Sequence, residues 1–150
     1  MPNLLRNILA VLAGVIVGSI VNMTLIALSA TIIPPPAGVD VSTAEGLSQG
    51  IHLFQPRHFL MPFLAHALGT LVGAFVAYLA AASYKERIAY GVGVFFLLGG
   101  IAASFMIPAP AWFIAADIVL AYLPMAWLGV QLGRRMGRAK SAAVIGNQRA

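Results

Sequence analysis

Residues 8–33 read ILAVLAGVIVGSIVNMTLIALSATII, a run that contains no charged side chain. A helix needs about 20 consecutive apolar residues to cross the hydrocarbon core of a bilayer, so this run is long enough to span a membrane. Three further runs of the same kind follow at residues 59–83, 88–107 and 112–133. Their apolar residues are continuous rather than alternating, which argues against a transmembrane β-barrel. The sequence therefore predicts an all-α membrane protein, a bundle of four transmembrane helices.

The composition of the whole chain supports this prediction. Of its 150 residues, 61% are hydrophobic and 9% are charged, whereas soluble domains average about 45–50% and about 25%. So few charged side chains cannot cover the surface of a soluble domain, and disorder would require low hydrophobicity with high charge. The chain has no cysteine, which excludes disulfides and iron–sulfur clusters. We expect the lipid bilayer to surround the chain.

The lysine and arginine residues fall mostly on one side of the predicted bundle. With four spans, all of them except Arg57 lie beside the termini or in the predicted turn at residues 84–87. Cytoplasmic loops carry such an excess, so we predict that both termini are cytoplasmic, in a bacterial inner membrane. The same positions account for the net charge of +5, and we expect no nucleic-acid partner. Residues 134–150 are predicted to be a basic cytoplasmic tail, with four side chains that contact anionic lipid headgroups: Arg134, Arg135, Arg138 and Lys140.

The connection between the first two runs is the only long one, an outer loop of about 25 residues. Three prolines at residues 34–36 end the first helix, because proline cannot donate a backbone hydrogen bond. Ser42 and Glu45 have the spacing of a capping box, which predicts a short surface helix up to about Gly50. Pro56 is expected in the first turn of the second span. The loop either caps the bundle or shapes a site.

Small residues recur along one side of each predicted span. Lipid supplies no hydrophobic force between helices, so residues that allow backbones to approach closely mark the contact faces. In the first span these residues follow at steps of four, and in the second they share one helix face. We expect the helices to pack through six glycines in particular: Gly14, Gly18, Gly69, Gly73, Gly93 and Gly100.

Asp117 and His66 are ionisable residues inside the predicted spans. They lie about one and a half and two turns from the outer ends of the fourth and second runs. A carboxylate at that depth costs at least about 2.5 kcal/mol, which makes it a candidate functional residue by default. We predict that the two side chains face each other, either as a structural hydrogen bond or on a proton or cation path. Asn22 and Thr70 complete the predicted intramembrane polar site.

Catalytic and metal-binding patterns are missing from the sequence. There is no Ser–His–Asp arrangement with an oxyanion loop, and the glycine pairs lie inside a membrane span rather than in a phosphate loop. The three histidines lack the tight spacing of zinc ligands. We therefore expect no catalytic residue, no metal, no cofactor and no enzymatic activity.

Three functions remain open from the sequence. The first is a small membrane protein that packs against copies of itself or serves as an accessory subunit of a larger membrane complex. This hypothesis rests on the many glycines suited to helix contacts and on the small number of residues suited to catalysis or metal binding. The second is a small transporter or channel for a proton-coupled or cationic solute, with Asp117 and His66 on the path. The third is a lipid- or quinone-binding membrane protein, in which His66, Asn22 and Asp117 supply the polar groups of an apolar pocket.

Overall fold

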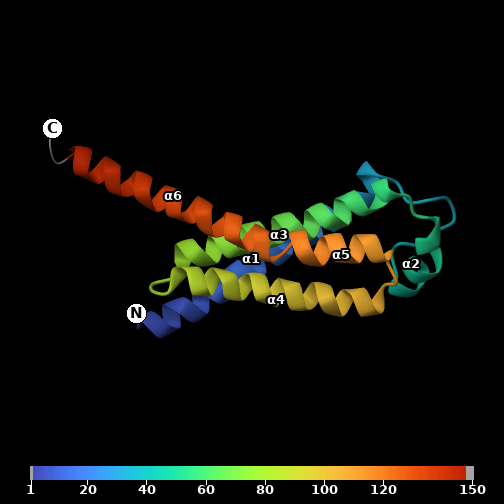
Figure 1. The fold of residues 1–150 in the computed structure, drawn as a ribbon, viewed down its shortest axis with the longest axis horizontal. Coiled ribbons are helices and arrows are strands. Elements are labelled where there is room, and N and C mark those ends of the chain that lie inside the picture. Colours follow the sequence, from blue (N-terminus) through green and yellow to red (C-terminus); the bar gives the residue numbers. More distant parts are fainter. Residues whose placement is uncertain (1, 148–150) are drawn as a thin grey trace.

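The computed structural model describes residues 2–147, with side chains up to residue 139. Within this part of the chain the regular structure is entirely helical, and four stretches are long and apolar enough to cross a membrane. The helices run side by side in an elongated bundle (Figure 1). The α3–α4 turn and the N-terminus lie at one end of the bundle, here the turn end, and the long loop lies at the other, here the loop end. The predicted all-helical fold with four candidate spans is confirmed.

The helices are longer or shorter than predicted by a few residues at most ends. The first span begins at Asn3 rather than Ile8, and residues 81–84, not 84–87, form the turn between the second and third spans. The elements in chain order are α1 Asn3–Ile32, α2 Ala44–Gly50, η1 Ile51–Leu53, η2 Pro56–Phe59, α3 Leu60–Ala80, α4 Lys85–Met106, α5 Ala111–Leu120 and α6 Leu123–Asn147.

The fourth span differs from the prediction of one continuous helix over residues 112–133. It consists of α5 and α6, separated by a break at Ala121 and Tyr122. Pro124 explains the break, because its ring clashes with the carbonyl four residues earlier, that of Leu120, and it has no N–H to donate. After the break, α6 continues past Gly133 to Asn147, so the first part of the predicted tail is helical.

Backbone contact between α1 and α3 forms the closest helix pair of the bundle. A Cβ atom added to Gly14 would lie 2.6 Å from the carbonyl oxygen of Gly73, and one added to Gly18 would lie 2.6 Å from that of Gly69. The reverse distances, from Gly73 to Gly14 and from Gly69 to Gly18, are 2.7 and 2.9 Å. Only glycine fits at these four positions, so the two helices lie backbone against backbone.

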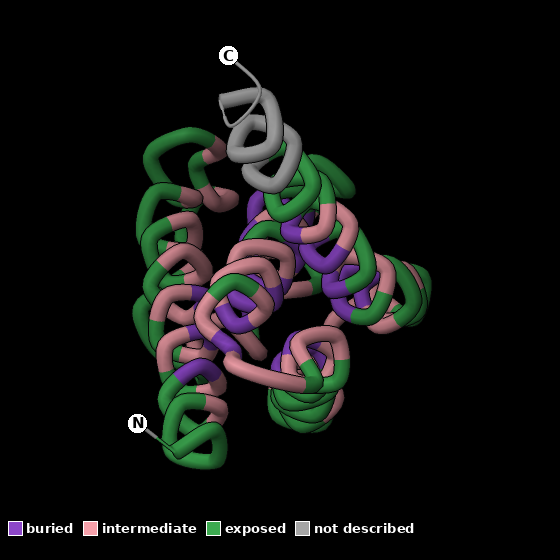
Figure 2. Tube along the Cα trace, turned by 90° about the vertical axis from the view of Figure 1, so that its left-hand side faces the viewer, coloured by how far each residue is buried: buried purple, intermediate pink, exposed green. Residues whose placement is uncertain are grey.

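The packing of α6 against α3 and α4 also depends on glycine. A Cβ on Gly129 would lie 2.6 Å from the carbonyl oxygen of Leu71, and one on Gly93 would lie 2.6 Å from the Cβ of Ala126. Fully buried small side chains fill this region between the helices, as the inward-facing buried segments of Figure 2 illustrate. The members of this core are Ala74, Ala89, Ala126 and Val130.

Several polar contacts link the helices at the turn end, among them a hydrogen bond of 3.0 Å from Arg6 Nε to the carbonyl oxygen of Ala80. The side chain of Asn7 in α1 accepts hydrogen bonds from the backbone N–H groups of Ala82 and Ser83 at 3.0 and 3.3 Å, and its amide donates to the Ser83 hydroxyl at 3.0 Å. Glu86 at the start of α4 forms a half-exposed ion pair with Arg134 of α6, with an Nε–Oε1 distance of 2.9 Å. These contacts join α1 to the α3–α4 turn and the start of α4 to α6.

The long loop folds over the opposite end as a compact cap. Its predicted short helix is present as α2, but the capping residue is Thr43, whose hydroxyl accepts from the N–H of Gly46 at 3.0 Å. Ser42 donates instead to the carboxylate of Asp40, from its N–H at 2.8 Å and its hydroxyl at 2.6 Å. Pro56 occupies the first turn of η2, as expected.

Candidate functional site

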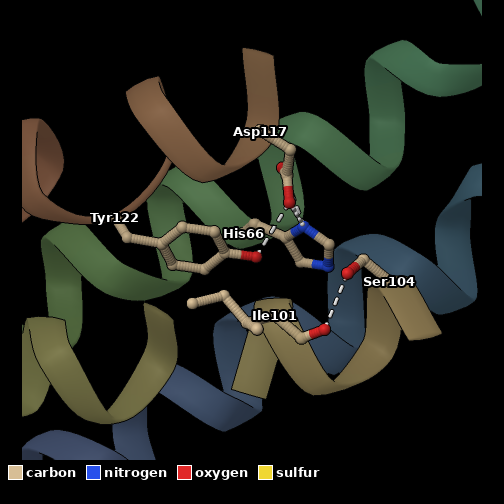
Figure 3. Close-up of polar contacts among 5 residues, drawn as sticks. All are labelled: His66, Ile101, Ser104, Asp117 and Tyr122. Carbon is tan, nitrogen blue, oxygen red and sulfur yellow. Dashed lines mark hydrogen bonds and ion pairs between the residues drawn. The ribbon is translucent and has the colours of Figure 1, made fainter. Parts of the chain in front are cut away.

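Three side chains meet in a hydrogen-bonded group between α3, α5 and the break (Figure 3). The Nδ1 atom of His66 lies 2.9 Å from both carboxylate oxygens of Asp117. The hydroxyl of Tyr122 donates to Asp117 Oδ2 at 2.9 Å. The structure therefore brings together the two ionisable residues singled out in the sequence, and it adds a third.

The broken helix is what brings Tyr122 to Asp117. In an uninterrupted helix two residues five apart would point about 140° away from each other. The break at Ala121 and Tyr122 redirects the tyrosine, so that its hydroxyl reaches back to a carboxylate on the last turn of α5. Its ring also stacks on that of His66, with centroids 5.8 Å apart and an interplanar angle of 26°. In many membrane transporters the binding site is formed by discontinuous helices.

The carboxylate of Asp117 is the buried centre of the group. Its side chain is 7% exposed, whereas that of His66 is 25% exposed. An ionised carboxylate only accepts hydrogen bonds, and it is matched here by the Tyr122 hydroxyl and, when Nδ1 carries a proton, by the imidazole. In that tautomer the second ring nitrogen, Nε2, stays available, and it is directed toward α4 on the side of Ser104 (Figure 3).

A cavity of about 230 Å³ lies directly above this group, on the side of the loop end. The loop forms its roof, through Leu47 of α2 and the residues that follow, and His66 and Asp117 form part of its floor. Apart from these two residues, His58 and Ser104, its lining is apolar, with three aromatic rings and several aliphatic side chains. The remaining lining residues are Ile26, Ile51, Phe54, Phe59, Pro62, Gly100, Ala103, Ile107, Ala109, Phe113, Ile114 and Ile118.

A second cavity, of about 180 Å³, meets the first at the histidine. It lies between the middle parts of α1 and α4 and contains Asn22 on one side and Phe96 on the other. His66, Gly100 and Ala103 line both cavities. The imidazole is therefore accessible from two directions, from beneath the loop and from between α1 and α4.

The two other predicted polar residues have different surroundings. Asn22 lines the second cavity, and its Cβ would lie 3.0 Å from a Cβ placed on Gly69. Thr70 is fully buried one helical turn beyond His66, and its hydroxyl has no hydrogen-bond partner among the described residues. Thr70 lines neither cavity.

The aromatic residues of the roof form a connected cluster, which the sequence did not reveal. Phe59 is buried against Phe113 and Trp112 of α5, with ring centroids 4.8 and 5.5 Å apart, and Phe54 packs against Phe59 at 5.8 Å. Aromatic residues at span ends usually lie at the membrane interface. Here their contacts with one another join the loop to α5 above the cavity.

One of the four basic residues predicted to contact lipid headgroups is paired within the chain. Arg134 pairs with Glu86, while Arg135 and Arg138 are exposed on α6. The side chain of Lys140 lies outside the described residues.

No group of three potential metal ligands occurs among the described side chains. His58 accepts a hydrogen bond from the backbone N–H of Gln55 at the start of η2.

Comparisons of the chain with protein-family models, with curated proteins and with solved structures gave no significant match. The arrangement of residues at the site therefore carries the functional argument.

Proposed function

We propose that this protein binds an apolar membrane ligand with a small hydrogen-bonding head, of the quinone or lipid class, and that the head contacts His66. The observation that carries this proposal is the apolar cavity of about 230 Å³ whose floor contains the His66–Asp117 pair. Ligand sites are typically such apolar hollows with one or two convergent polar groups.

The size of the cavity suits a substituted six-membered ring. An engineered cavity of about 150 Å³ is large enough to bind benzene, and the present one exceeds that volume. The rings of Phe54, Phe59 and Phe113 line its upper part. Aromatic rings interact favourably with a flat ring by stacked or edge-on contact, which favours a quinone over a saturated lipid head.

The histidine supplies the polar contact with the head. With Nδ1 held by Asp117, the Nε2 atom accepts a hydrogen bond from a hydroxyl when the imidazole is neutral and donates to a carbonyl when it is protonated. The Asp117 carboxylate holds the imidazole ring in this orientation. Both the carbonyl and the hydroxyl form of a quinone head therefore find a partner at the same atom.

Calorimetric titration of the purified protein with 2,3-dimethoxy-5-methyl-1,4-benzoquinone, which has no tail, tests the proposal. His66→Asn keeps an amide near the position of Nδ1 but removes Nε2, so we expect affinity to fall by about tenfold, the equivalent of one hydrogen bond to a polar group. His52→Asn is the matched control, because His52 is exposed on η1 and lines neither cavity. Equal affinity in the two variants, or no binding by the natural sequence, would refute the proposal.

The glycines no longer give a reason to prefer the hypothesis of a packing subunit. The glycines that suggested it, including Gly14, Gly73 and Gly93, contact other helices of the same chain. Binding to a second copy or to a larger complex stays a prediction, and the native mass of the solubilised protein tests it. Transport of a proton-coupled or cationic solute also stays a prediction, to be tested by flux in proteoliposomes with Asp117→Asn.

We further propose that the turn end faces the cytoplasm and the loop end faces outward, as the distribution of Lys and Arg indicates. The chain has no cysteine, so a single introduced one reports its own side. An impermeant maleimide applied to intact cells should label Ser42→Cys and should label Ala139→Cys only after lysis. The opposite pattern would invert the proposed orientation.

A further inference from the structure

The second cavity opens on a part of the bundle where two neighbouring helices touch only lightly. α1 packs mainly on α3, and its contact with α4 is small by comparison. Ser19, Asn22 and Met23 of α1 line one side of the cavity, and Phe96 and Gly99 of α4 line the other. Met23 and Gly99 are also exposed on the outer surface of the helices, so the cavity reaches the outside between them.

The opening lies near the middle of both helices. Residues 19–23 are close to the centre of α1, Asn3–Ile32, and residues 96–103 follow the centre of α4, Lys85–Met106. In a helix that crosses a bilayer, the central turns face hydrocarbon rather than headgroups. What lies outside this opening is therefore the acyl interior of the membrane.

We propose that the gap between α1 and α4 is a lateral port, through which the apolar tail of the ligand extends into the bilayer while its head lies at His66. This inference rests on the proposed function, because it assigns the tail of the same ligand. The occupant is a single isoprenoid or acyl chain. A 180 Å³ hollow that joins the head cavity at His66 at one end and meets hydrocarbon at the other fits a chain of this kind.

Gly99 provides a way to close the port without disturbing the fold. A Cβ atom added at Gly99 would meet no other atom within 4 Å, so a larger side chain there enters open space rather than a neighbouring helix. The adjacent Gly100 is unsuitable, because a Cβ there would collide with the ring of Tyr122. Gly91 is the matched control: it also has open space within 4 Å, it lies on the same helix, and it lines neither cavity.

The first experiment compares two benzoquinones that differ only in a decyl tail, at one fixed micelle concentration. Gly99→Leu should weaken binding of the decyl compound by about tenfold, the equivalent of losing a few buried methylene groups. It should leave the tail-less compound unchanged, and Gly91→Leu should change neither. If Gly99→Leu and Gly91→Leu bind the decyl compound equally well, the port is refuted while head binding at His66 stands.

A second experiment tests the port without relying on a quinone. The protein is reconstituted in phosphatidylcholine vesicles that contain a phosphatidylcholine with a diazirine in its acyl chain, and the crosslinked residues are mapped by mass spectrometry. We expect crosslinks at Ser19 and Asn22 in the natural sequence and in Gly91→Leu, and their loss in Gly99→Leu. No crosslink at these residues in the natural sequence would overturn the port. Crosslinks that follow this pattern without quinone binding would leave the port standing and refute the proposed head.

Discussion

The half of the bundle at the turn end and the half at the loop end are built from the same kinds of residue but packed in different ways. Toward the turn end, Gly14, Gly73 and the alanines around Val130 bring backbones into direct contact, and the buried side chains there are small and apolar. Toward the loop end the helices diverge around two cavities, and a carboxylate, an imidazole and a phenol share one hydrogen-bonded group.

This difference shows how a small bundle of apolar helices can keep space in its interior. Glycine contacts bring the backbones of one half into direct contact, which anchors the helices relative to one another. The break before Pro124 then redirects the fourth span, and the loop covers the space that results. Close helix packing and internal cavities thus lie in different halves of the same four candidate spans.

Gly73→Leu should disrupt the packing of the half at the turn end and give the largest loss of stability. A side chain at Gly73 would press on the carbonyl of Gly14, 2.7 Å from the added Cβ, and backbone cannot rotate away as a side chain does. We expect the free energy of unfolding to fall by about 3 kcal/mol, at the upper end for overpacking. Titration with sodium dodecyl sulfate, followed by circular dichroism, measures it.

The control for this variant is Gly91→Leu on the open face of α4. It should be neutral or slightly stabilising, since leucine favours a helix over glycine by up to about 1 kcal/mol. Similar losses in both variants would mean that the glycine contacts do not anchor the bundle.

Thr70→Val changes a residue at the boundary between the two halves and should increase the free energy of unfolding. The Thr70 hydroxyl is fully buried and has no hydrogen-bond partner among the described residues, so it is desolvated without compensation. Valine has nearly the same shape, and we expect a gain of about 1 kcal/mol in the same unfolding titration. Thr24→Val is the control, because the exposed Thr24 hydroxyl donates to the carbonyl of Ile20 and its loss should bring no gain. A destabilised Thr70→Val would show that the hydroxyl has a partner in the membrane.

Tyr122→Phe probes the open half and should have a smaller effect on stability. It removes one hydrogen bond, 2.9 Å long, to Asp117 and keeps the ring stacked on His66. Hydrogen bonds between membrane helices average about 0.6 kcal/mol, and we expect a loss of that size. Tyr90→Phe, in the aromatic lining of the packed core, is the comparison for the removal of a phenol hydroxyl. A loss several times larger in Tyr122→Phe would mean that the site, rather than the glycine contacts, holds the bundle together.

The smallest expected effect on stability comes from Asp40, in the loop that covers the half with the two cavities. Hydrogen bonds from the side chain and backbone of Ser42 hold the pKa of Asp40 below its ordinary value of 3.8. Because the folded pKa is the lower one, the contribution of Asp40 to stability is present above that ordinary value and is lost as the pH falls below it. A carboxyl NMR titration should show a midpoint below 3.8 that moves up in Ser42→Ala. An unchanged midpoint would show that this turn does not form in solution.

The sequence alone predicted the number of spans, because run length and hydropathy depend on local composition. It also predicted that Asp117 and His66 lie at similar depth, since depth follows from counting residues along each span. Pairing is a tertiary property, however, and counting could not show that Nδ1 meets both carboxylate oxygens.

Tyr122 was not found in the sequence, although a signal was present. Five residues after Asp117, it falls on the opposite face of a continuous helix, and only the break reverses that. Pro124 was the signal for the break, because a proline inside a helical pattern ends or bends the helix. The cavities had no such signal, because the space between helices depends on the packing of several spans at once.

The side chain of Asn7 has a consequence for the order in which the protein assembles. It caps the turn after α3 by accepting the N–H of Ala82, a residue 75 positions later in the chain. Those N–H groups gain this partner only once α3 has paired with α1. The turn between α3 and α4 is therefore completed by a residue of α1, and its capping depends on the pairing of α1 with α3.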